Sequence, residues 1–259
     1  MNSFKEDGPS YNWEHSKVES VSEYLGIDIK TLDDGVFQFC KTGFIRKVLD
    51  ATGMDHFNGL PTPTKVEVPL GTDSNGSDAK RDCPNVYASV IGMMLYLESN
   101  TRPDISFAVH QGFRFTHNTK ATRETAVKRI CRYLQGTKDN GLVFNPSKKL
   151  VLDFYADADF SGLRGNENPQ DPVCDKRRTG FVVTFSNFPL LWVSKLQTEI
   201  ALSTLHSGYV SLSRSVRAVL PLKIIIKEVI DNTVYDDNNG SIVVATSPSM
   251  TPTSKHISV

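Results

Sequence analysis

Two aspartates at the end of a predicted β-strand, Asp157 and Asp159, have the spacing best suited to chemistry. They close the run Leu150–Phe160, LVLDFYADADF, whose earlier residues are typical strand formers. Side chains two residues apart lie on one face of a strand, so the two carboxylates repel each other unless a cation or water screens them. Hard oxygen ligands suit Mg²⁺. The pattern therefore favours a divalent-metal site; the alternative is a strand that runs into a solvated acidic loop.

A second pair of acids, Asp236 and Asp237, follows a short predicted strand at Thr233–Tyr235. Ligands of layered α/β sheets bind outside the strand ends. If the two acidic strands are neighbours, we expect Asp157 and Asp237 to converge at one edge of the sheet.

Three basic residues, Lys128, Arg129 and Arg132, fall mostly off the apolar stripe of a predicted helix at Thr122–Gln135. A basic face on a short helix can hold phosphates. The alternative, which is the commoner case, is a face that is merely solvated. The sequence leaves both readings open.

Composition describes an ordinary globular chain of one or two domains. Its 259 residues are 39% hydrophobic and 22% charged, and 29 Lys and Arg balance 29 Asp and Glu. The charge is uneven, however, because Thr101–Leu150 holds ten Lys or Arg and only three Asp or Glu. No apolar run reaches the ~20 residues that a membrane span needs.

The four cysteines lie far apart and have neither zinc-ligand spacing nor the density of a disulfide framework. A reducing, intracellular compartment, cytoplasmic or nuclear, is the simpler expectation. The sequence also lacks a G-x-S-x-G nucleophile elbow, a P-loop and a G-x-G-x-x-G motif, which argues against other common enzyme classes.

The elements that must position these residues follow from periodicity and turn signals. The first half predicts a hairpin (23–29 and 36–39), helices at 41–54, 86–98, 103–115 and 122–135, and a flexible linker at 59–82. After the acidic strand come a hairpin at 180–185 and 189–194 and a long helix from Ser203 or Thr204 to about Ile230, interrupted or kinked at Pro221. The expected apolar stripe of that helix is Leu205, Tyr209, Leu212, Val216 and Val219. This order predicts a mixed sheet with flanking helices, an α+β or α/β fold.

An ordered series of motifs resembles copia-type LTR retrotransposon polyproteins. The first half is similar to the end of the family's reverse transcriptase, with its thumb and connection, and the second half to its ribonuclease H domain. The matching stretches cover nearly the whole chain: Ser22–Ile29, Tyr87–Val109 with the run Thr101–Ile105, Ala126–Phe144, Tyr155–Phe160, Arg177–Phe185, Leu190–Thr204, Tyr235–Ser241 and Ser254–Ile257.

The resemblance implies a nuclease site of four carboxylates that hold two Mg²⁺, or Mn²⁺, roughly 4 Å apart. The first acid corresponds to Asp157 and the later one to Asp237, with Asp236 beside it and Asp159 as a further ligand. Gly208 stands where the family has a glutamate. The fourth acid would lie beyond Val259, and the polymerase aspartates are not found before Ser22. We therefore expect a decayed or fragmentary copy whose catalysis is impaired.

The expected division is 1–58 for the end of the palm and thumb hairpin and helix, 59–85 for a linker, 86–149 for the helical thumb and connection, and 150–259 for a C-terminally truncated ribonuclease H-like domain. An RNA–DNA hybrid or another nucleic acid, and the missing upstream polymerase and integrase parts, are the expected partners; no membrane is expected. The alternative is a nucleic-acid-binding remnant without catalysis. His206 is expected to be a surface or capping residue rather than a metal ligand.

Overall fold

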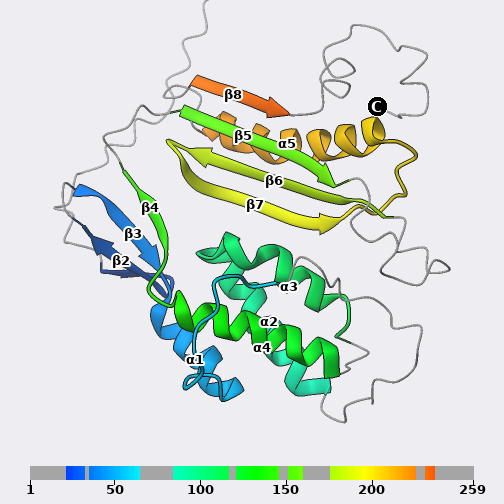
Figure 1. Cartoon of the computed structure of the whole chain (residues 1–259). Helices are drawn as coiled ribbons and strands as arrows, with labels where there is room; N and C mark the ends of the chain where they lie inside the picture. Colours follow the sequence, from blue (N-terminus) through cyan, green and yellow to red (C-terminus); the bar gives the residue numbers. More distant parts are fainter. Residues whose placement is uncertain are drawn as a thin grey trace, which may run out of the picture.

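Two four-stranded sheets flank a group of helices (Figure 1). The computed structural model describes residues 22–32, 35–64, 84–116, 121–145, 151–159, 176–225 and 231–236. Within this described part, no helix combines the length and the apolar character that crossing a bilayer requires. The mixture of helices with antiparallel and mixed sheets agrees with the predicted α+β class.

The first sheet has the strand order β1-β2-β3-β4 and is antiparallel throughout. Strands β2 (Ile27–Thr31) and β3 (Phe37–Cys40) form the predicted hairpin, and β1 (Glu23–Tyr24) extends it. The fourth strand, β4 (Leu142–Phe144), was not predicted, and it comes from the chain that follows the helices. This sheet therefore joins two distant parts of the sequence.

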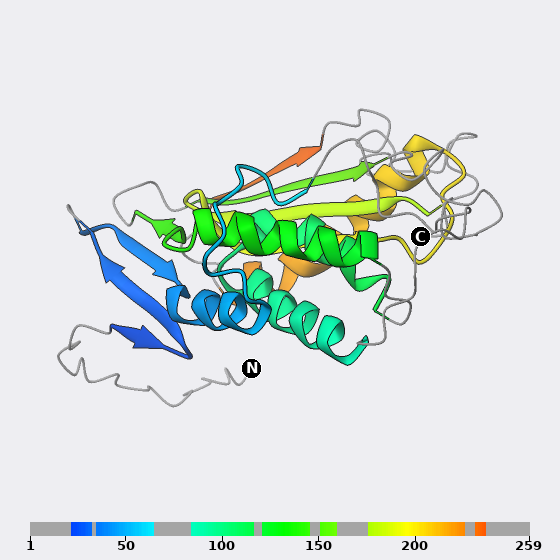
Figure 2. The ribbon, with the colours of Figure 1, turned by 60° about the horizontal axis from the view of Figure 1, so that its bottom comes forward.

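The helices α1 (Thr42–Thr52), α2 (Pro84–Asn100), α3 (Ser106–Phe113) and α4 (Ala121–Gly136) pack together beside the sheets (Figure 2). A short 3-10 helix, η2 (Pro103–Ile105), leads into α3 and has the proline at its start, as predicted. All four helices lie close to their predicted positions, and Gly53 ends α1 in the left-handed conformation at φ 63°. The predicted stripe of α4 is buried: Val127, Ile130, Cys131 and Leu134.

The residues after α1, some of which belong to the predicted linker, pack against α4. The backbone N–H of Leu60 donates to the oxygen of Arg132 at 3.1 Å. Gly59 lies so close to α4 that an added Cβ would be 2.6 Å from the Cα of Gly136. This segment therefore contacts α4, where a glycine on each side lets the two backbones touch. The linker at 59–85 stays a prediction. Residues 65–82 of the linker lie outside the described part, and the domain boundaries stay a prediction.

The second sheet has the order β7-β6-β5-β8. The predicted acidic strand is β5 (Val151–Asp159), which pairs antiparallel with β6 (Arg178–Phe185) and parallel with β8 (Asp231–Asp236). A tight turn with positive φ at Ser186 (52°) and Asn187 (68°) connects β6 to β7 (Phe188–Leu196), which confirms the predicted hairpin. The mixed sheet is thus present as expected.

Helix α5 (Thr204–Ile225) covers one face of this sheet. Of its predicted stripe only Leu212 and Val219 are buried, where they meet Leu152, Phe154, Ala156 and other core residues of β5 and β6. Val216 is 37% exposed, and the remaining contact face consists of small side chains, Ser207, Ser211 and Ser215, each at most 1% exposed. Small residues let the helix approach the strands closely. The predicted stripe is thus confirmed at Leu212 and Val219 and wrong at Val216.

The helical group and the second sheet also contact each other. The guanidinium of Arg178 on β6 lies over the ring of Phe107 on α3, 4.8 Å from the ring centroid. The two sheets meet through Phe188 on β7, whose ring lies 5.3 Å from Phe39 and 5.5 Å from Phe144. These aromatic contacts connect the elements before and after residue 150.

Candidate functional site

The acidic end of β5 is the first candidate site. Asp157 pairs with Gly180 of β6, and its side chain is exposed. One carboxylate oxygen, Oδ1, accepts the backbone N–H of Ala158 at 2.7 Å, which fixes the side chain close to its own strand. The carboxylate remains accessible to solvent and therefore to ions.

Strand β8 ends beside this position. Its last residue, Asp236, pairs in parallel with Ala156, the neighbour of Asp157. The chain therefore leaves β8 at the same edge of the sheet at which β5 ends. Asp237 and the side chains of Asp159 and Asp236 lie outside the described part, so their convergence with Asp157 stays a prediction.

The first turns of α5 lie against the same strand end. The hydroxyl Oγ of Ser203 accepts the backbone N–H of His206 at 3.0 Å, which is the N-cap interaction that starts the helix. The ring Nδ1 of His206 accepts the N–H of Leu202 at 3.4 Å, so this histidine completes the cap, as expected. Further along, the hydroxyl of Ser211 donates to the backbone oxygen of Asp157 at 2.6 Å.

Gly208 lies one turn before Ser211 on the buried side of α5. Residues three apart share a helix face, so position 208 belongs to the face that contacts the end of β5. Over the described residues, no three His, Cys, Asp or Glu side chains come together as metal ligands would. The metal-binding roles of Asp157, Asp237, Asp159 and Asp236 stay predictions.

The three basic residues of α4 all have partners within the chain. Lys128 forms an ion pair with Glu124 at 2.7 Å. The guanidinium of Arg129 donates to Thr62 Oγ1 at 2.7 Å, and Arg132 Nε donates to the oxygen of Asn58 at 3.0 Å. Arg129 and Arg132 thus help to hold the segment after α1 on α4, and a phosphate-binding role for these residues stays a prediction.

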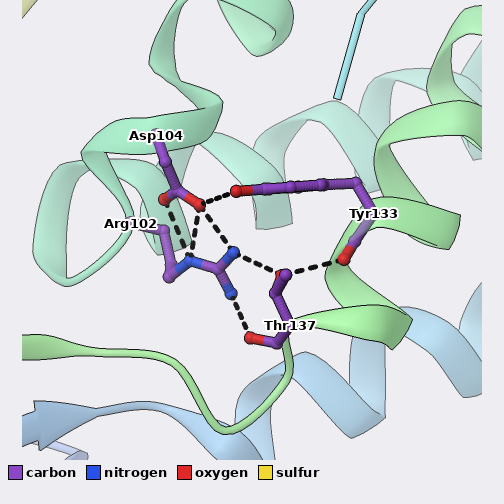
Figure 3. Close-up of polar contacts among 4 residues, drawn as sticks. All are labelled: Arg102, Asp104, Tyr133 and Thr137. Carbon is purple, nitrogen blue, oxygen red and sulfur yellow. Dashed lines mark hydrogen bonds and ion pairs between the residues drawn. The ribbon is translucent and has the colours of Figure 1, made fainter. Parts of the chain in front are cut away.

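A cluster of four polar residues was missed by sequence reasoning (Figure 3). Arg102, only 2% exposed, donates from Nε and Nη2 to the carboxylate of Asp104 at 2.9 and 2.7 Å. It also donates to the backbone oxygen and hydroxyl of Thr137 at 3.0 and 2.7 Å. The hydroxyl of Tyr133 donates to Asp104 at 2.7 Å. The cluster therefore fastens the turn after α2 to the end of α4.

The electrostatics of the cluster follow from these contacts. Burial alone would raise the pKa of Asp104, but the hydrogen bonds and charge of Arg102 and the hydrogen bond from Tyr133 outweigh it and hold the pKa below its usual value. Burial and the neighbouring Asp104 carboxylate raise the pKa of Tyr133. Arg102 and Asp104 belong to the run Thr101–Ile105, but their partners on α4 gave no signal in the sequence.

Comparison with known proteins places the chain among relatives. It is 31% identical over 227 residues, 83% of its length, to the retrovirus-related Pol polyprotein from transposon TNT 1-94 of Nicotiana tabacum. It is 28% identical over 246 residues, 93% of its length, to the retrovirus-related Pol polyprotein from transposon RE1 of Arabidopsis thaliana. The chain belongs to the Pol polyprotein family of copia-type retrotransposons.

This Pol polyprotein chain spans only 16% of the length of those two relatives. It is also 30% identical over 193 residues to an uncharacterized mitochondrial protein of Arabidopsis thaliana, a match that covers 74% of the chain and 75% of that protein. No protein-family model matches the chain. No solved structure matches it either.

Proposed function

We propose that this Pol polyprotein chain contains a ribonuclease H-like domain at 150–259, preceded by the thumb and connection part of a reverse transcriptase. The supporting observation is the pairing of β5 with β8, because it brings the carboxyl ends of the two acidic strands to one edge of the sheet. The strands that the resemblance assigns to the nuclease also lie in a single sheet under α5.

In this proposal Asp157 and Asp237, with Asp159 and Asp236 beside them, hold Mg²⁺ or Mn²⁺ at the strand ends. The exposed carboxylate of Asp157 fits such a role, because Mg²⁺ binds through one or two carboxylates and keeps several water ligands. When bound, the ions would activate a water molecule and stabilise the leaving oxygen of a phosphodiester. The four aspartates would hold these ions against the RNA strand of an RNA–DNA hybrid.

Gly208 makes the proposed site weak. The position lies on the face of α5 that contacts the β5 end, but glycine supplies no carboxylate there. A glycine inside a helix also costs roughly 1 kcal/mol relative to alanine. We therefore propose that cleavage of RNA in hybrids is impaired in this chain.

Cleavage of an end-labelled RNA strand in an RNA–DNA hybrid tests this proposal. With Mg²⁺ or Mn²⁺, we expect little cleavage by the unmodified chain and partial recovery in Gly208→Glu. Adding Asp157→Asn to Gly208→Glu should remove the recovered activity. Robust cleavage by the unmodified chain that Asp157→Asn abolishes would contradict the impairment, and no gain in Gly208→Glu would contradict the proposed metal site.

A second candidate function is nucleic-acid binding without catalysis, which the ten basic residues between Thr101 and Leu150 favour. Lys128 is the most direct test residue, because its side chain is half exposed and, among the residues that the structure describes, it pairs with Glu124 alone. If it contacts a phosphate, Lys128→Gln should reduce the slope of log K against log salt by about one. Lys47→Gln on the exposed side of α1 is the matched control. Equal slopes for both variants would exclude Lys128 from the interface.

A further inference from the structure

Three serines on the buried face of α5 make different contacts. The hydroxyl of Ser207 donates to Thr204 O at 2.9 Å, and that of Ser215 donates to Leu212 O at 2.7 Å, so each of these two hydroxyls bonds within its own helix. The backbone oxygen of Ser207 accepts the side-chain amide of Gln197 at 2.9 Å. Ser211 instead reaches the sheet. Its Oγ lies 2.6 Å from the backbone oxygen of Asp157 and 3.2 Å from that of Gly180.

These contacts join three elements at one point. Asp157 and Gly180 are register partners on β5 and β6, and Ser211 attaches α5 to both of them. Ser211 is 1% exposed, so no bulk water competes for its hydroxyl. A buried hydroxyl that bonds to a strand fixes the helix above that strand more firmly than apolar contacts do, because hydrogen bonds are directional.

We infer that Ser211 is a positioning residue for the metal site proposed above. By holding α5 to the backbone of Asp157, it sets where a side chain at position 208 lies relative to the Asp157 carboxylate. This inference rests on the proposed metal site at the end of β5, whereas the hydrogen bond from Ser211 to Asp157 is present in the structure in any case. Ser211 acts through the backbone and touches neither ion nor substrate.

The first experiment keeps Gly208 and needs no metal. Ser211→Ala should speed hydrogen exchange of the Ala158 and Gly180 amides about tenfold, since it removes the bond that holds the strand ends to α5. Ser215→Ala is the matched control, with equal burial on the same helix, and should change these amides less than about twofold. Equal effects of the two variants at the strand end would overturn the inference.

The second experiment separates positioning from a merely structural role. Mn²⁺ affinity is measured in Gly208→Glu, where a second carboxylate should raise it about tenfold. Adding Ser211→Ala should remove most of that gain, whereas adding Ser215→Ala should keep it. Circular dichroism checks that both double variants are folded. A gain that survives Ser211→Ala overturns the positioning role. If Gly208→Glu gives no gain at all, the proposed metal site fails, and the exchange experiment alone decides what Ser211 does.

Discussion

The indole Nε1 of Trp192 lies 3.0 Å from the backbone oxygen of Glu98. This hydrogen bond joins β7 to the last turn of α2, where the final carbonyl groups of a helix have no partner within the helix. The carboxylate of the same glutamate lies 3.3 Å from Nε2 of His110 on α3, and both side chains are largely buried. Glu98 therefore connects the second sheet to two helices at once.

Replacing Trp192 with phenylalanine should lower the free energy of unfolding by about 1 kcal/mol, because the ring is kept while the donor to Glu98 is lost. Urea denaturation followed by circular dichroism measures the change. An unchanged midpoint would show that water replaces the indole hydrogen bond without loss of stability. The contact between β7 and α2 would then depend on apolar packing alone.

Arg102→Lys should destabilise the chain by roughly 2–3 kcal/mol, although the charge is kept. A lysine ammonium cannot reproduce the paired bonds to Asp104 and the further bonds to Thr137. Arg46→Lys, on the exposed side of α1, is the control and should stay within about 0.5 kcal/mol of the parent in urea denaturation. Similar losses in both variants would mean that the cluster adds no stability.

The lowered pKa of Asp104 predicts a dependence of stability on pH. A carboxyl whose pKa is lower in the folded state stabilises the fold above its unfolded pKa, near 3.8, and this stability is lost as the pH falls through the folded pKa. Urea midpoints between pH 7 and pH 2 should show a fall in that acidic range for the parent. Asp104→Asn should be less stable at pH 7 and show a smaller fall. If the urea midpoints of the parent and of Asp104→Asn fall in parallel with pH, groups other than Asp104 cause the loss of stability in acid.

Asp153→Asn should raise stability by about 1 kcal/mol. Asp153 lies directly opposite Thr184, and their exposed fractions are 9% and 8%. Thr184 Oγ1 has no hydrogen-bond partner, and in the described part of the chain no hydrogen bond or ion pair involves the Asp153 side chain. Removing a buried charge therefore relieves a desolvation cost. Asp139→Asn, at an exposed position outside the sheets, is the control; a loss of stability in Asp153→Asn would show that the charge is compensated.

Local patterns were enough for much of the fold. The strands of the second sheet and helix α4 were predicted because their side-chain periods are regular and their turns carry recognisable residues. Strand β4 was missed because three residues carry little periodicity, and its partner β3 lies far away in the sequence. The buried serines of α5 were missed because a small polar residue looks like a surface residue until the sheet is placed against it.

The candidate site could be predicted in part. The acidic end of β5 and the position of Gly208 follow from local sequence and resemblance, whereas the contact between Ser211 and the backbone of Asp157 depends on how the helix packs. The same holds for Arg129 and Arg132, whose partners after α1 no pattern on α4 could reveal. Long-range contacts of single side chains have no signature in one sequence.

The pairing of Phe37 with Phe144 has a consequence for synthesis on the ribosome. Until β4 emerges, with the whole helical group made before it, β3 is an open strand with aromatic side chains and unsatisfied backbone groups. Such a strand invites pairing with another nascent chain. Release of the chain before Leu142 should therefore yield aggregates rather than a smaller soluble protein.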